Sequence, residues 1–172
     1  MSKSIKVHMP ALIWVIALLV FPYFSFADQY KCSRVVDGDT IQVDNNGNQL
    51  IIRLVGIDAP ELPKKKNLPG QPFCVKAKEY LANRILNKVV DIKFYGKNRH
   101  GLLLGEVFVD EININLEMIY AGLAEVYRGK PARNLDIAIY RNAERKAKGS
   151  IQGIWVLRDQ YFSPWDWREI YR

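Results

Sequence analysis

Short runs rich in β-branched, aromatic and other apolar residues, separated by turn signals, characterise the chain after its N-terminal segment. Residues 30–36 and 40–43, in which polar residues stand between the apolar ones, form two such runs, and Asn46-Gly47 is the strongest turn signal in the sequence. A third run, residues 50–55, follows that turn closely. The pattern predicts three consecutive strands, with a hairpin between the second and the third.

Apolar side chains then take up helical spacing over residues 75–87. Residues 89–95 and 102–109 return to the short apolar runs that are typical of strands. The middle of the chain therefore predicts one helix followed by two further strands. Residues 62–72, which precede the helix, hold three prolines and a lysine run and indicate a surface loop.

Two more helices are expected in the C-terminal third of the chain. A short one covers residues 115–120 with Asn115 as its N-cap, and a longer one starts at Asn134 or Asp136 and ends at Gly149. The aromatic segment near the C-terminus is expected to fold back onto the domain.

The order of elements is three strands, a helix, two strands and two helices. Five short strands with a helix between the third and the fourth fit a small closed β-barrel of the OB type, mainly β within the α+β class, with three α-helices. Barrels of this type bind nucleic acids across one face. The sequence has no internal repeat, so we expect one barrel domain over residues 28–172.

The first 27 residues have the composition of a secretory signal peptide. Lys3 and Lys6 precede an apolar run over residues 11–21, and Ala27 ends a small-residue pattern suited to cleavage. The alternative is an uncleaved membrane anchor, but the run is shorter than the ~20 residues that span a bilayer. We therefore expect residues 1–27 to be removed and the mature protein to be secreted or periplasmic, without membrane attachment.

The chain has more basic than acidic residues, which bears on the kind of molecule that it binds. The formal charge is +7, and it falls to +5 when the segment that contains Lys3 and Lys6 is removed. A basic surface suits an anionic polymer such as a nucleic acid, although a mildly basic soluble protein would carry the same charge. No stable protein partner is indicated, and we expect a monomer.

Two cysteines, Cys32 and Cys74, follow the signal segment. Export leads to an oxidising compartment, so we expect them to form a disulfide, with two buried free thiols as the alternative. Zinc and haem sites are not indicated, because the sequence has no Cys-x-x-Cys and only two histidines.

Candidate chemistry is concentrated between Asp39 and Glu61. Asp39 and Asp58 are carboxylates able to hold a hard divalent cation. Arg53 is the polar exception in an apolar strand, so it must leave the core or find an anion such as phosphate. Glu61 can take a proton from water. The four groups together predict a site that hydrolyses phosphodiesters; the alternative is a set of turn residues and a structural ion pair.

Four motifs, in order along the chain, carry a family resemblance. They are Asp-Gly-Asp-Thr at 37–40, Arg-Leu-x-Gly-Ile-Asp-Ala-Pro-Glu at 53–61, Asn-Leu-Glu-Met at 115–118 and Gly-Leu-Ala-Glu-Val-Tyr at 122–127. With these motifs the chain closely resembles the staphylococcal nuclease (thermonuclease) family. The Pro-Trp-Asp-Trp-Arg tail is similar to that of its exported bacterial members.

The resemblance implies an OB barrel that depends on Ca²⁺ and cleaves both DNA and RNA. It also implies the ligands of the metal. Asp39 and Asp58 would bind calcium through their side chains, the backbone carbonyl of Ala59 would be a third ligand, and Asp37 would be an outer-shell acid.

The remaining site residues also follow from the resemblance. Glu61 would activate or position the attacking water, and Arg53 would hold the phosphate. Tyr127 would contact a nucleotide because of its family position. The expected products carry 3′-phosphates.

One family position is not matched. The family pattern places a second arginine at the start of the fifth strand, and a gapless alignment through Gly101 and Gly105 puts Leu102 there. Leucine cannot bond a phosphate oxygen. Three interpretations stay open: Arg99 swings in from the loop and contacts the nucleic acid in place of the missing arginine, His100 serves as the acid instead, or the protein binds nucleic acid and cuts it slowly or not at all.

The sequence thus predicts an exported calcium-dependent endonuclease of DNA and RNA. A catalytically weak or inactive nucleic-acid-binding module is the alternative, because of Leu102. A structural or adhesion domain of the envelope is a third class.

Overall fold

The computed structural model describes residues 29–65 and 67–171. The predicted signal peptide, residues 1–27, lies outside these ranges. Within them, none of the helices combines the length and the apolar content of a membrane-spanning segment.

Three consecutive antiparallel strands open the fold, as the sequence predicts. They are β1 (Gln29–Val35), β2 (Thr40–Asn45) and β3 (Asn48–Leu54). The turn between β2 and β3 contains Asn46 and Gly47, whose φ angles are 52° and 86°. Asparagine and glycine adopt positive φ angles with little strain, which explains why this dipeptide forms the hairpin turn.

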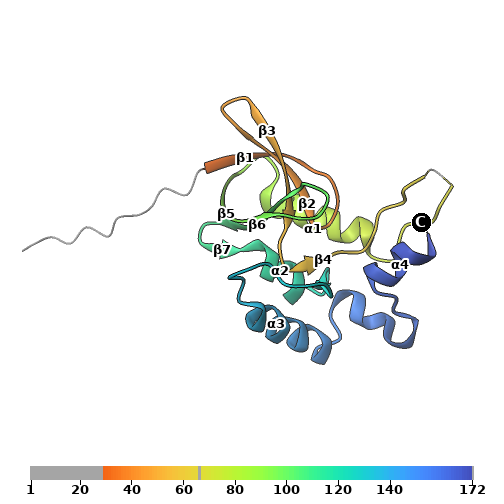
Figure 1. Ribbon diagram of the computed structural model, residues 1–172. Helices are drawn as coiled ribbons and strands as arrows, with labels where there is room; N and C mark the ends of the chain where they lie inside the picture. The colour runs from red at the N-terminus through yellow and green to blue at the C-terminus, as the bar shows by residue number, and fades with distance from the viewer. Residues whose placement is uncertain (1–28, 66, 172) are drawn as a thin grey trace, which may run out of the picture.

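Two further strands close the sheet into a barrel. β5 (Val89–Lys97) pairs antiparallel with β1, and β6 (Leu103–Val109) pairs antiparallel with β5. β6 also runs parallel to β3, with Ile52 opposite Leu103, which joins the two sides of the sheet. The predicted five-stranded barrel is therefore confirmed (Figure 1).

The three predicted helices are present as α1 (Cys74–Ile85), α2 (Ile114–Tyr120) and α3 (Ile137–Gly149). α1 packs against β1 with its apolar face buried, and α2 packs on both β6 and α3 (Figure 1). Asp136, one of the two expected caps, begins α3 by accepting a hydrogen bond from the Ala138 N–H at 3.1 Å.

Three two-residue strands add to this frame, and the sequence pattern does not predict them because two residues carry no periodicity. They are β4 (Ile57–Asp58), β7 (Ile112–Asn113) and β8 (Glu125–Val126). β4 pairs antiparallel with β8, so Asp58 lies opposite Glu125. This small second sheet fixes the chain that follows β3, and with it the backbone of Asp58.

The aromatic tail folds back onto the domain and adds helices beyond the three predicted. The 3-10 helix η1 (Gly153–Gln160) leads to α4 (Pro164–Ile170), which lies beside the segment that follows β4 (Figure 1). Ser163 caps α4 by accepting a hydrogen bond from a backbone N–H of its first turn at 3.0 Å. The Gln71 side chain donates to the Phe162 carbonyl at 2.8 Å and ties the tail to the loop before α1.

Cys32 and Cys74 are separate buried thiols, so the disulfide prediction is wrong. The Asn87 N–H donates to the Cys32 carbonyl at 2.9 Å, which places Cys32 beside the C-terminal end of α1. Cys74 is the first residue of the same helix. The helix is roughly 18 Å long at 1.5 Å per residue, whereas a disulfide needs Cα atoms about 4.4–6.8 Å apart.

Asn115 is a core residue, and the prediction that it caps the helix is wrong. Asn113 caps α2 instead, because its side chain accepts a backbone N–H of the first turn. The fully buried Asn115 side chain donates to the carbonyls of Val55 and Gly105 at 2.9 and 3.0 Å, and accepts from the Val107 N–H at 3.0 Å. It therefore joins the chain that follows β3 to β6, where the barrel closes.

Replacing Asn115 with alanine should destabilise the fold, because the change removes three buried hydrogen bonds. We expect a loss on the order of 2–4 kcal/mol in the free energy of unfolding, measured by urea denaturation. The control is Asn142→Ala on the exposed face of α3, which should change stability by less than about 0.5 kcal/mol. Equal stabilities of the two variants would contradict the bridging role of Asn115.

Candidate active site

Asp39 and Asp58 come from separate β segments and meet below the surface. Asp39 immediately precedes β2, and Asp58 ends β4. Gly56, with φ at 81°, makes the sharp turn from β3 into β4, and a Cβ atom there would lie 2.9 Å from the Leu135 side chain. Asp58 is fully buried and Asp39 is 2% exposed. Two buried carboxylates in one place require cations nearby.

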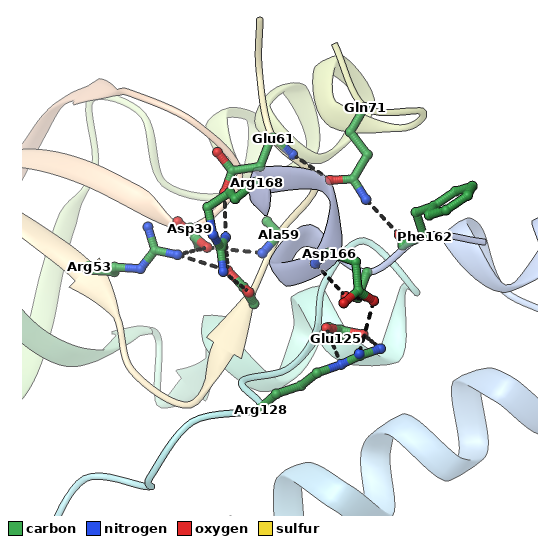
Figure 2. Close-up of polar contacts among 12 residues, drawn as sticks. Asp39, Arg53, Ala59, Glu61, Gln71, Glu125, Arg128, Phe162, Asp166 and Arg168 are labelled. Carbon is green, nitrogen blue, oxygen red and sulfur yellow. Dashed lines mark hydrogen bonds and ion pairs between the residues drawn. The ribbon is translucent and has the colours of Figure 1, made fainter. Parts of the chain in front are cut away.

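Arg53 supplies the first of these cations. It lies in β3 directly opposite Thr40, so its side chain reaches the end of the barrel at which β2 begins. One guanidinium nitrogen, Nη2, donates to Asp39 and to Asp58 at 2.9 Å each (Figure 2). Arg53, the charged residue in this apolar strand, is therefore paired with two buried carboxylates. A charge in surroundings of low polarity is stable only when it is paired in this way.

Neighbouring donors fix the carboxylate of Asp39. The Thr40 hydroxyl and the Ala59 N–H each donate to one of its oxygens at 3.0 Å. Asp37 accepts the Asp39 N–H at 3.0 Å and so holds the turn before β2. Ala59 thus contacts Asp39 through its amide, and the metal-ligand role expected of its carbonyl stays a prediction, as does the outer-shell role of Asp37.

Arg168 supplies the second cation, and sequence reasoning missed it as a site residue. Its Nη1 and Nη2 donate to the two oxygens of Asp58 at 2.9 and 2.7 Å, and Nη1 also donates to Glu61 (Figure 2). A two-pronged pair of this kind is the strongest contact that arginine makes with a carboxylate. The signal in the sequence was the arginine of the tail motif, but nothing local links it to Asp58, 110 residues earlier.

Glu61 is positioned by the same tail. Its N–H donates to the Gln71 side chain at 3.0 Å, and the Gln71 N–H donates back to the Glu61 carbonyl at 2.9 Å. Gln71 in turn holds the carbonyl of Phe162, immediately before the cap of α4. The loop that carries Glu61 and the C-terminal tail therefore form one hydrogen-bonded unit (Figure 2).

A groove of about 930 Å³ lies against this cluster, and Arg53, Glu61 and Arg168 line it. Tyr127, Trp165 and Glu169 also contribute to its walls. The remaining basic side chains along it are Lys64, Lys97, Arg99, Lys130 and Arg133. Positive charge along a groove of this size suits the backbone of a nucleic acid.

Leu102, where the sequence motifs lead one to expect an arginine, lies on the wall of the groove. Leu102 is half-buried there, and Asn98 accepts its N–H at 3.0 Å. Arg99 and His100 are exposed in the adjacent loop, where the Arg99 Nε donates to His100 at 3.1 Å. The predicted contacts Arg99 and Tyr127 thus line the groove together with Arg53 and Glu61, which also belong to the cluster around the buried aspartates.

Comparison with known sequences decides the family. Residues 51–157 match the sequence model of a family described as staphylococcal nuclease homologue. The chain belongs to the staphylococcal nuclease family. The resemblance found in the sequence motifs is thereby confirmed, and the closed barrel agrees with it.

Similar proteins match most of the chain. An uncharacterized endonuclease of Escherichia coli O157:H7 is 35% identical over 138 residues, 78% of this chain and 81% of that protein. The thermonuclease of Staphylococcus hyicus is 32% identical over 128 residues, 73% and 75% of the two chains. An uncharacterized endonuclease of Haemophilus influenzae is 31% identical over 156 residues, 88% and 81%.

In this member of the nuclease family, burial opposes ionisation of both aspartates. It raises the pKa of Asp39 to about 6, although Arg53 acts in the opposite direction. Burial also raises the pKa of Asp58, against the hydrogen bonds from Arg168. Arg53 stays charged, because Asp39 raises its pKa above the usual range. A further cation close to the two aspartates would favour their ionised forms.

The donor atoms of this cluster suit a hard cation such as Ca²⁺. Asp39 and Asp58 present carboxylate oxygens on either side of one Arg53 nitrogen, and calcium takes 6–8 oxygen ligands. In residues 29–65 and 67–171, no three His, Cys, Asp or Glu side chains are grouped as a metal site. A calcium ion would therefore need backbone or water oxygens beside the two aspartates, and would compete with the guanidiniums for their oxygens.

Asp39→Asn should stabilise the protein at neutral pH when metal is removed by a chelator. Folding raises the pKa of Asp39 from 3.8 to about 6, so the folded state binds a proton here more tightly than the unfolded state does. This proton binding stabilises the folded state fully below the unfolded value of 3.8, and the stabilisation is lost as the pH rises through 6. Asparagine cannot ionise, so the variant should be more stable than the parent at pH 7, by on the order of 1–3 kcal/mol.

The measurement is urea unfolding at pH 4 and pH 7. The difference between Asp39→Asn and the parent should shrink at pH 4, where the parent carboxyl is largely protonated in the folded state. Asp159→Asn, an exposed control, should behave like the parent at both pH values. A variant that is less stable than the parent at pH 7 would refute this reading of the buried carboxylate.

Proposed function

We propose that this protein is a calcium-dependent endonuclease that hydrolyses phosphodiester bonds in DNA and RNA. The observation that carries the proposal is that Arg53 and Glu61 line one basic groove, next to two buried carboxylates. A phosphate-binding cation, a proton acceptor and oxygen ligands for a metal are the groups that this hydrolysis needs. Membership of a nuclease family supports the same conclusion.

In this proposal Asp39, Asp58 and the carbonyl of Ala59 hold Ca²⁺, and Asp37 supports them from the adjacent turn. When bound, the ion polarises the phosphoryl oxygens and offsets negative charge as it develops. Arg53 is 24% exposed, and its planar fork binds a non-bridging oxygen of the phosphate from the groove side.

Glu61 is the proton acceptor in this proposal. Its side chain is 21% exposed, and its backbone is fixed by Gln71, so the carboxylate is held at the groove. The water whose proton it takes attacks phosphorus opposite the departing 5′-oxygen. The products then carry 3′-phosphates.

The groove determines which polymers are accepted. Its basic side chains, Arg99 among them, contact successive phosphates, and Tyr127 contacts a nucleotide. Phosphate contacts fix the position of a nucleic acid without identifying its bases. We therefore propose that the enzyme cuts DNA and RNA alike.

The proposal extends to the location and state of the protein. Lys3, Lys6 and the apolar run over residues 11–21 support export through a cleaved signal peptide, into the periplasm or the medium. The mature chain then acts as a monomer on nucleic acid outside the cytoplasm.

A second candidate function is a nucleic-acid-binding module that turns over slowly or not at all. The observation that favours it is Leu102, an apolar side chain on the groove wall at the position of a family arginine. Such a module would keep the basic groove and would bind DNA with a strong dependence on salt.

Glu61→Gln should slow the cutting of plasmid DNA about 10²–10⁴-fold, because glutamine keeps the size of the side chain and cannot accept a proton. Addition of EDTA to the parent should stop the reaction as well, because Asp39 and Asp58 then lack their ion. The measurement is nicking of supercoiled plasmid and cleavage of labelled RNA, followed by analysis of the 3′ ends.

Glu79→Gln is the matched control, since Glu79 is exposed on α1 and does not line the groove. It should cut at the rate of the parent. Equal cutting by the parent, the EDTA sample and Glu61→Gln would refute the calcium mechanism. Retardation of DNA without any cutting would favour the binding module.

A further inference from the structure

We propose that Arg168 supplies the second phosphate-binding guanidinium of the site, in place of the strand arginine that this chain lacks at Leu102. The inference rests on the proposed nuclease function, because it assigns a further residue to the same reaction. It differs from the three interpretations that the sequence leaves open, which are a role for Arg99, a role for His100, and a protein that binds nucleic acid but cuts it slowly or not at all.

The guanidiniums of Arg53 and Arg168 lie close together at one side of the groove. Arg53 and Arg168 each place a nitrogen 2.9 Å from the same oxygen of Asp58, so the two nitrogens are closer than twice that distance. The two side chains are 24% and 25% exposed and line the same groove. Two planar forks this close can bind two non-bridging oxygens of one phosphate.

The net charge of the cluster also favours a phosphate-binding role for Arg168. The carboxylates of Asp39, Asp58 and Glu61 and the guanidiniums of Arg53 and Arg168 leave one net negative charge. A divalent cation turns this into one net positive charge, which matches the single negative charge of a phosphodiester. Without Arg168 the loaded cluster would be neutral, and a phosphate would enter it without net attraction.

Hydrogen bonds hold α4, and with it Arg168, in place beside the groove. Asp166 accepts hydrogen bonds from Ser163 at 2.6 Å and from Arg128 at 3.2 Å, and the preceding carbonyl of Phe162 is held by Gln71. Arg168 is thus fixed before any substrate arrives, which lowers the entropic cost of using it. Arg99 is exposed in a loop and pairs with His100 instead.

The test is a mutant cycle on the full chain, measured as the rate of oligonucleotide cleavage with Ca²⁺. Arg168→Ala should lower kcat/KM by about 10³-fold, the lower end of the effect of arginines in phosphoryl transfer. Arg168→Lys keeps the charge without the fork and should recover only part of the loss. Leu102→Arg should raise the rate more in the Arg168→Ala background than in the parent, because it restores the missing charge only there.

Calcium affinity separates a phosphate-binding role from a structural one. It is measured by calorimetry without nucleic acid, on Arg168→Ala and on Arg145→Ala, an exposed control on α3. Removing a positive charge beside Asp58 should leave the affinity for Ca²⁺ unchanged or higher. A loss of calcium binding as large as the loss of activity would show that Arg168 only holds Asp58 in place, and would overturn the proposal.

Nucleic-acid binding tests Arg168 independently of turnover. In the Glu61→Gln background with Ca²⁺, adding Arg168→Ala should weaken binding of a short single strand and lower the salt slope by about 0.7. If the parent chain binds DNA but never cuts it, the proposed function fails while this measurement still decides on Arg168. An unchanged salt slope, a rate within threefold of the parent, or no rescue by Leu102→Arg would each overturn the assignment.

Discussion

Burial of the Asp58 carboxylate is the constraint on which the arrangement of this site depends. An ionised carboxylate away from water costs several kcal/mol unless cations and donors surround it. Asp58 is fully buried and accepts hydrogen bonds from Arg53 and Arg168. The first arginine comes from β3 of the barrel, and the second comes from α4 at the opposite end of the chain. The arrangement of the site therefore requires the tail to be docked on the barrel.

The sequence could predict the barrel and half of the site, since both depend on local signals. The hairpin at Asn46-Gly47 and the runs on either side of it determine the first three strands, and Arg53 stands out as a charge inside an apolar run. Arg168 could not be assigned, because its contact with Asp58 spans 110 residues and leaves no periodic trace. Asn115 and the two thiols were misjudged for the same reason, since three-dimensional packing decides which polar groups are buried and which cysteines meet.

The buried carboxylates of the site lower the stability of the folded protein when no cation is bound. Burial raises the pKa of Asp39 to about 6, so the unliganded cluster holds carboxylates that resist ionisation. A cation bound beside these carboxylates would lower this cost in stability, so part of its affinity would come from relief of native-state destabilisation. Leu102, where the family resemblance predicts an arginine, is then compatible with the proposed nuclease activity, provided that the positive charge comes from α4.

The most direct test of this account is a crystal structure of the Glu61→Gln variant with Ca²⁺ and a short oligonucleotide. The account predicts one phosphate in contact with both Arg53 and Arg168, beside an ion held by Asp39 and Asp58. A phosphate bound by Arg99, with Arg168 still confined to Asp58, would contradict it.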